Sequence, residues 1–117
     1  MDRILVTQVY ASLLSLEKKL TEVKQLIEQR KNKAHIYQPL IPQFQATISK
    51  MRKTANFLQL SLAKKDWAGV VRNTEVFYGL SYLIRGELLS TYGKLLRNES
   101  EKVSVSINIS SKETRYH

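Results

Sequence analysis

This 117-residue sequence predicts an all-α fold, an antiparallel bundle of three long helices with a flexible or strand-like C-terminal tail. Three observations lead to that fold. Apolar residues recur at alternating steps of three and four, which places them on one stripe of a helix. The chain has only four glycines and two prolines, unlike the turn-rich composition of β-sandwiches and barrels. One proline-bearing stretch and one Lys-Lys-Asp break divide the stripes into three segments.

The first helix is expected over residues 2–33. Asp2 suits the positive end of its dipole, and the cations of residues 30–33 suit the negative end. Further apolar residues widen the stripe, so the helix should contact two neighbours, or one neighbour and a second subunit that completes the bundle by dimerisation. The stripe itself forms three heptads: Val6, Val9, Leu13, Leu16, Leu20, Val23 and Ile27.

A loop over residues 35–42 holds both prolines and separates the first helix from the second. We expect the second helix over residues 42–64 and the third over 66–98, with Asp66 as the N-cap of the third helix and Trp67 covering the end of the core. Because the connection between them is so short, these two helices should pack antiparallel.

The third predicted helix contains all four glycines, and Gly79, Gly86 and Gly93 lie seven residues apart on one stripe. Each glycine costs about 1 kcal/mol relative to alanine inside a helix, a cost that calls for a reason. A groove for a partner helix or an extended chain would explain the stripe. Tight packing against the other two helices would also explain it, as would tolerance of glycine on the solvent side.

After residue 98 the pattern changes, so we divide the chain into a bundle domain, 1–98, and a tail, 99–117. Residues 102–110 alternate apolar and polar side chains, the period of a strand with one apolar face. A strand here would have no neighbour in the same chain. The segment would therefore be a disordered tail, a strand that pairs with its copy in a dimer, or a strand that adds to the sheet of a partner.

The net charge of +9 is concentrated in one segment. Residues 18–65 hold 11 basic and two acidic side chains, whereas the rest of the chain holds eight of each and is neutral. This asymmetry favours a region that faces nucleic acid, an anionic membrane surface or an acidic protein. An excess of lysine that merely solubilises the bundle is the alternative.

A helical hairpin that turns near Tyr37 would bring position 24 about level with position 50. The cations would then crowd the loop end, and Tyr37 would be placed to stack on a base. Such a patch binds nucleic acid weakly, with tolerance of sequence and sensitivity to salt. The predicted nucleic-acid-binding residues are Lys24, Arg30, Lys31, Lys33, Lys50, Arg52, Lys53 and Tyr37.

The sequence carries no pattern of an enzyme, a metal site or a cofactor site. It has no cysteine, no glycine-rich phosphate loop and no nucleophile elbow, and its two histidines lie far apart without ligand-spaced carboxylates. We also expect no signal peptide, because the first residues show neither a basic leader nor a continuous apolar run, and no membrane span, because a run of about 18 apolar residues is lacking. We therefore expect a non-enzymatic, cytoplasmic protein without a cofactor.

Two short segments resemble known families. The Arg-x4-His spacing of Arg30 and His35 is similar to that of the HEPN ribonucleases, and the resemblance implies that both would act on a phosphate, although that family carries the motif near the start of a late helix. Residues 62–67 and 77–81 resemble the histidine-phosphotransfer domain, whose histidine would fall at Glu75. Because Glu75 cannot be the phosphate-accepting nucleophile, this resemblance implies docking without phosphotransfer.

The sequence thus favours a small binding protein that uses its basic helical hairpin to engage nucleic acid or a nucleoprotein complex. The alternative is a protein–protein interaction module, such as a secretion chaperone, an immunity protein or an adaptor. That module would bind through Gly79, Gly86, Gly93 and the C-terminal tail.

Overall fold

The computed structural model describes residues 2–30 and 35–107. They form three helices, α1 (Asp2–Gln29), α3 (Leu40–Ala63) and α4 (Trp67–Ile107), and a 3-10 turn, η1 (His35–Tyr37). This part of the chain contains no strand, so the predicted all-α fold of three long helices is confirmed. The molecule is elongated, with principal extents of 66 × 29 × 18 Å.

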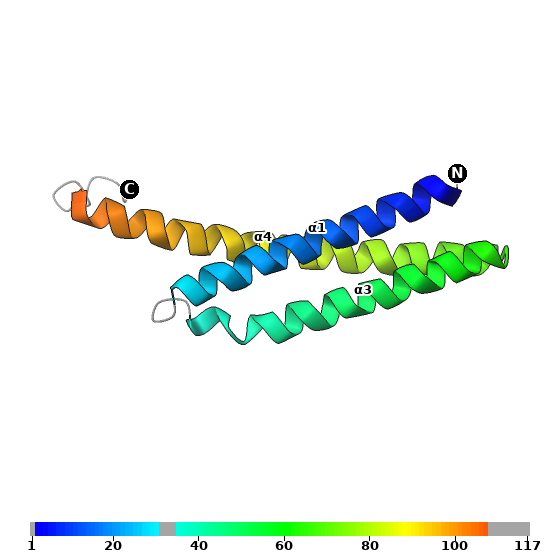
Figure 1. The fold of residues 1–117 in the computed structure, drawn as a ribbon, viewed down its shortest axis with the longest axis horizontal. Coiled ribbons are helices and arrows are strands. Elements are labelled where there is room, and N and C mark those ends of the chain that lie inside the picture. Colours follow the sequence, from blue (N-terminus) through cyan, green and yellow to red (C-terminus); the bar gives the residue numbers. More distant parts are fainter. Residues whose placement is uncertain (1, 31–34, 108–117) are drawn as a thin grey trace.

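The helices lie side by side along the long axis, and each runs in the direction opposite to that of the helix before it in the sequence (Figure 1). Two hydrogen bonds show that α1 and α3 are antiparallel. The Tyr10 hydroxyl donates to Gln59, and Arg52 donates to Glu17. From the first bond to the second, the residue number rises by seven in α1 and falls by seven in α3. Between α1 and α4 the numbers rise together, since Ser12 lies beside Ser81 and the Lys19 ammonium lies over the Tyr92 ring. The helices α1 and α4 are therefore parallel.

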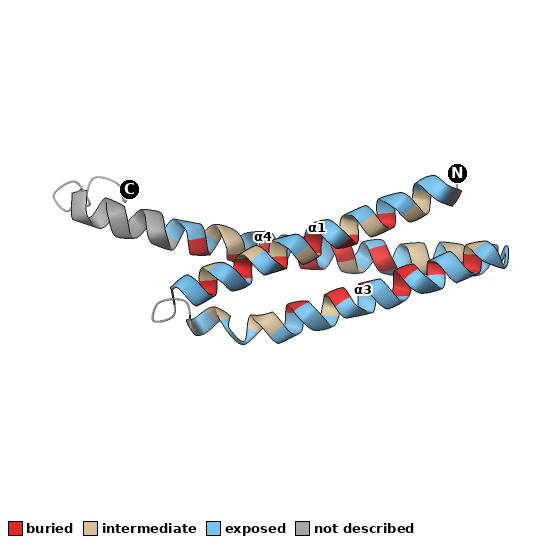
Figure 2. Ribbon diagram, viewed as in Figure 1, coloured by how far each residue is buried: buried red, intermediate tan, exposed pale blue. Residues whose placement is uncertain are grey.

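The core lies along the line where the three helices meet (Figure 2). Six of the seven predicted stripe residues of α1 are buried, and Val6 is half-buried. The apolar stripe of α4 passes through Phe77, Ile84, Leu88 and Leu95, which are buried. Before Phe77 the helix is exposed on this side, since Trp67 and Val71 are both 56% exposed. The prediction that Trp67 covers the end of the core is therefore wrong. The buried apolar residues are Val9, Leu13, Leu16, Leu20, Val23, Ile27, Phe44, Ile48, Met51, Ala55, Leu58, Phe77, Ile84, Leu88 and Leu95.

The turn between α3 and α4 confirms Asp66 as the N-cap of α4. The Gly69 amide donates to Asp66 Oδ1 at 3.1 Å, which satisfies one of the unpaired amides of the first helical turn. Lys65 has a φ of 58° and reverses the chain within two residues. Gly69 has no room for a side chain, since a Cβ there would lie 2.5 Å from Asp66 Oδ2 and 2.6 Å from Ser61 Oγ.

The other helix ends differ from the predicted ones. The helix α1 ends at Gln29, and α3 begins at Leu40, with Pro39 at an N-cap that makes no side-chain cap bond. Pro42 lies in the first turn of α3, where a missing amide donor costs little. Residues 31–34 lie outside the described part of the chain.

The helix α4 continues to Ile107 and so crosses the predicted domain boundary at residue 98. Residues 103–107 are therefore helical and do not form the strand that their alternation allowed, and residues 108–117 lie outside the described part. Extending an existing helix adds one hydrogen bond for each residue fixed, without a new nucleation cost, and this outweighs a weak strand preference. Within the described residues, no helix combines the length and apolarity needed to cross a membrane.

Candidate functional site

The predicted basic patch depended on which positions of α1 and α3 lie level with each other, and the structure differs from the prediction in this respect. Because α1 and α3 pair Tyr10 with Gln59 and Glu17 with Arg52, position 24 lies opposite position 45 and not opposite position 50. Lys24 and Gln45 accordingly line the same shallow groove. The cations of residues 50–53 are therefore level with the middle of α1, and the prediction that they crowd the loop end is wrong.

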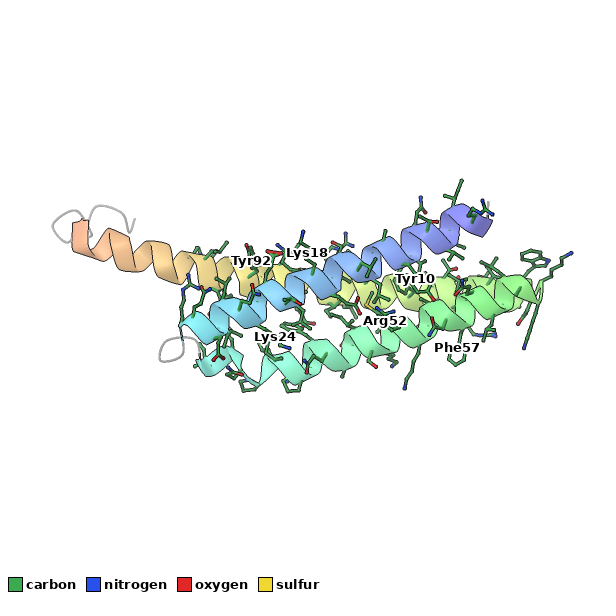
Figure 3. All side chains as sticks on the ribbon, viewed as in Figure 1. Tyr10, Lys18, Lys24, Arg52, Phe57 and Tyr92 are labelled. Atoms are coloured by element: carbon green, nitrogen blue, oxygen red, sulfur yellow. The ribbon has the colours of Figure 1, made fainter. Side chains whose placement is uncertain are left out.

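Arg52 lies in the α1–α3 groove and is paired there. Its Nη2 donates to Glu17 Oε2 at 2.6 Å, and Lys24 lines the same groove beside them (Figure 3). Glu17 stands one residue before the segment in which the positive charge is concentrated, so the sequence count left it out. Across the helix pair it offsets one of the counted cations.

Lys50 and Lys53 lie on a different side of α3 from Arg52. At about 100° per residue, Lys50 is about 160° away from Arg52 around the helix. It follows Gln43 and Thr47, which line a hollow with α4, so it flanks the α4 side. Lys53 is exposed on the outer surface. Lys50 and Lys53 are three residues apart, about 60° around the helix, so they share one side of α3, and Arg52 points in a different direction.

The remaining predicted nucleic-acid-binding residues do not restore a single patch. Tyr37 is half-buried and packs against the hydrophobic core, so part of its ring is covered by the bundle itself. The Arg30 guanidinium lies at the end of α1, with Nη1 3.5 Å from the Leu26 carbonyl oxygen. Lys31 and Lys33 lie outside the described residues. The residues that the structure places belong to several separate surfaces.

Gly79, Gly86 and Gly93 all lie on the outer side of α4, away from the other two helices. A Cβ added at Gly79, Gly86 or Gly93 would meet no atom within 4 Å. Packing within the bundle therefore does not require these glycines, and the alternative of tight packing against the other helices is wrong. Gly86 follows the buried Ile84 by two residues, about 200° around the helix, which turns it away from α1 and α3.

Large apolar side chains are exposed along the same side of α4. Tyr82 is 82% exposed, the highest value among the exposed large apolar side chains, and Leu89 and Leu96 follow it at intervals of seven. Tyr82 and Gly86 also border a shallow, mostly apolar hollow. We call these residues together the outer stripe: Gly79, Tyr82, Gly86, Leu89, Gly93 and Leu96.

Sequence reasoning found the glycines of this stripe but missed its large members. The signal was present, because Tyr82, Leu89 and Leu96 share the seven-residue spacing of the glycines and precede or follow them by three or four. Glu75, where the phosphotransfer resemblance would place the histidine, is exposed seven residues before Tyr82. The described residues contain no group of three histidine, aspartate or glutamate side chains that could hold a metal.

No protein-family model, curated protein or solved structure matches this chain.

Proposed function

We propose that this chain is a protein–protein interaction module whose docking surface is the outer stripe of α4. The observation that supports it is the open space over Gly79, Gly86 and Gly93, next to Tyr82, Leu89 and Leu96 in exposed positions. Three glycines in a helix interior cost the isolated chain about 3 kcal/mol in total, and no contact within the bundle offsets that cost.

The chemistry of the stripe fits an α-helical partner. A glycine on a helix surface lets the backbone of another helix approach closely, and a flanking tyrosine is the residue type that anchors interfaces. Apolar residues spaced by three and four match the anchor spacing with which one helix packs along another. A contiguous exposed apolar surface of this kind is typical of interaction sites on soluble proteins.

Site-specific crosslinking tests the docking surface. With a photoreactive benzoylphenylalanine at position 82, we expect a defined crosslinked protein in cells of the native host. A leucine at Gly86 should abolish the product, because its side chain fills the space that the partner occupies. The same photoreactive group at Lys18, exposed on α1, is the matched control. Equal products from positions 18 and 82 would contradict the proposal.

A second candidate function is contact with nucleic acid through α3. This helix has 24 residues and no aspartate or glutamate, while Lys50 and Lys53 are exposed on it and Lys64 and Lys65 follow it. Lysines of this kind neutralise phosphates without reading bases, so the contact would tolerate sequence and weaken with salt. Arg52 is left out of this surface because Glu17 already pairs with it.

Titration of labelled single- and double-stranded nucleic acid at two salt concentrations tests this second function. We expect affinity to fall by about tenfold or more between 50 and 200 mM salt, because several counterions are released on binding. Lys50→Glu with Lys53→Glu should remove most of the binding, and Lys18→Glu should change it little. If no binding is measured even at the lower salt, the second function is wrong.

A further inference from the structure

The outer stripe of α4 is complementary to itself when two copies lie antiparallel. We propose that a second copy of this chain docks there, related to the first by a two-fold axis at Gly86. The inference deepens the proposed function and rests on it, since it names the helix that the outer stripe receives. Three features carry it: the alternation of large and small residues along the stripe, the positions that the large residues would face in the second copy, and the charged residues at either end of the stripe.

The first feature is that large residues and glycines alternate with the same period. Tyr82, Leu89 and Leu96 are spaced by seven, and so are Gly79, Gly86 and Gly93. A repeat of seven keeps both sets facing one partner over several turns, as in a coiled coil. The large side chains of one helix then need spaces on the other, and the glycines provide them.

The second feature is where each large residue falls. Around an axis at Gly86, positions equally far from it on either side face each other. Tyr82 therefore lies opposite Ser90 of the second copy, in a space bordered by that copy's Gly86, Leu89 and Gly93. This is the arrangement of a knob in a hole formed by four residues of the facing helix.

Leu89 falls in the same kind of space. It lies opposite Leu83 of the second copy, between that copy's Gly79, Tyr82 and Gly86. Both knobs thus enter holes with a glycine on either side. Because the interface is two-fold, each contact occurs twice. A Cβ added at any of these glycines would meet no side chain and no other helix of its own chain within 4 Å, so the space over them is open without any movement in the bundle.

The third feature is charge complementarity. Glu75 and Arg97 are both exposed, and each is eleven residues from Gly86, so they face each other in the antiparallel arrangement. A parallel pair would instead bring Glu75 next to Glu75 and Arg97 next to Arg97, and like charges that meet across an interface disfavour that orientation. The charges therefore select the antiparallel orientation.

Single-cysteine crosslinking tests this arrangement, because the chain contains no cysteine of its own. The variants are Gly79→Cys, Gly86→Cys and Gly93→Cys, at positions where a Cβ meets no neighbour, and Ala46→Cys, exposed on α3, is the control. Under mild oxidation only Gly86→Cys should form a covalent dimer readily, because a disulfide bridges facing Cα atoms about 4.4–6.8 Å apart and so holds together two helices that an unbonded side chain at this position would separate. A mixture of Gly79→Cys and Gly93→Cys should form the mixed dimer.

The expected selectivity follows from distance. A disulfide needs Cα atoms within about 7 Å. Position 86 lies on the axis and meets its own copy, whereas the two copies of position 79 would lie fourteen residues apart along the helices, about 21 Å. A parallel dimer would crosslink at positions 79, 86 and 93 alike, and that result would overturn the antiparallel arrangement. Crosslinking of Ala46→Cys at the rate of Gly86→Cys would overturn a specific interface.

Charge reversal gives an independent readout with intact glycines. In a background with Gly86→Cys, Glu75→Arg should slow crosslinking, and the addition of Arg97→Glu should restore it. A monomeric wild-type mass by light scattering together with an uncrosslinked Gly86→Cys would overturn the second copy as occupant. If position 82 still crosslinked a different protein in the host, the proposed function would stand while this inference failed.

Discussion

Phe77→Ala should lower the free energy of unfolding by about 3–5 kcal/mol, a large part of the 5–15 kcal/mol typical of a whole domain. Phe77 is 0% exposed and belongs to the core cluster where α4 meets α1 and α3. Its ring also packs edge-on against Tyr78, with 5.4 Å between the ring centroids. Alanine would remove this burial and leave a cavity that the three helices fill only in part.

Urea denaturation followed by circular dichroism measures that loss. Phe57→Ala is the matched control, because the same side chain at position 57 is 57% exposed on α3 (Figure 3). Its removal should change the free energy of unfolding by less than about 1 kcal/mol. Similar losses at the two positions would mean that α4 does not pack its Phe77 side inward.

Changing Gly79, Gly86 and Gly93 together to alanine should raise the free energy of unfolding of the single chain by about 3 kcal/mol. Each methyl group enters open space, and alanine restricts the unfolded chain more than glycine does. Because the sites are seven residues apart, about 10 Å along the helix, their effects should add. The same methyl groups would hold a partner helix away, so stability should rise as association falls.

Chemical denaturation in dilute solution measures the first effect without a contribution from association, and the crosslinking yield of a photoreactive group at position 82 measures the second. Gly69→Ala is the control, since its methyl group would collide with Asp66 and Ser61 and should lower stability. A triple variant that is less stable than wild type would show that the outer side of α4 is occupied within the chain itself.

The fold could be predicted because the period of apolar residues matches the helix in all three segments. Leu13, Leu58 and Leu88 are fully buried as their stripes require. The end of α4 could not be predicted in this way, because valine and serine alternate over residues 103–106, which is the period of a strand. That local pattern takes no account of the long helix that precedes these residues in the chain. Elongation of that helix decides the conformation there.

The basic patch could not be predicted because it depended on how far α1 and α3 are offset. In the structure the offset brings Glu17 to Arg52, a pairing that the two helical patterns do not specify. A shift of five residues along α3, about 7.5 Å, separates the expected neighbours. The side of α4 on which the glycines lie does not depend on such an offset. The angle around the helix between the glycines and the apolar residues Ile84 and Leu88 follows from their positions in the sequence.

The length of α4 governs how this molecule moves through solution. At about 1.5 Å per residue its 41 residues extend for about 62 Å, nearly the whole 66 Å long axis of a chain of only 13.5 kDa. A rod of these proportions experiences more hydrodynamic friction than a sphere of equal mass. The monomer should therefore elute early from a gel-filtration column, at a volume that resembles that of a compact dimer, and only a shape-independent mass distinguishes the two.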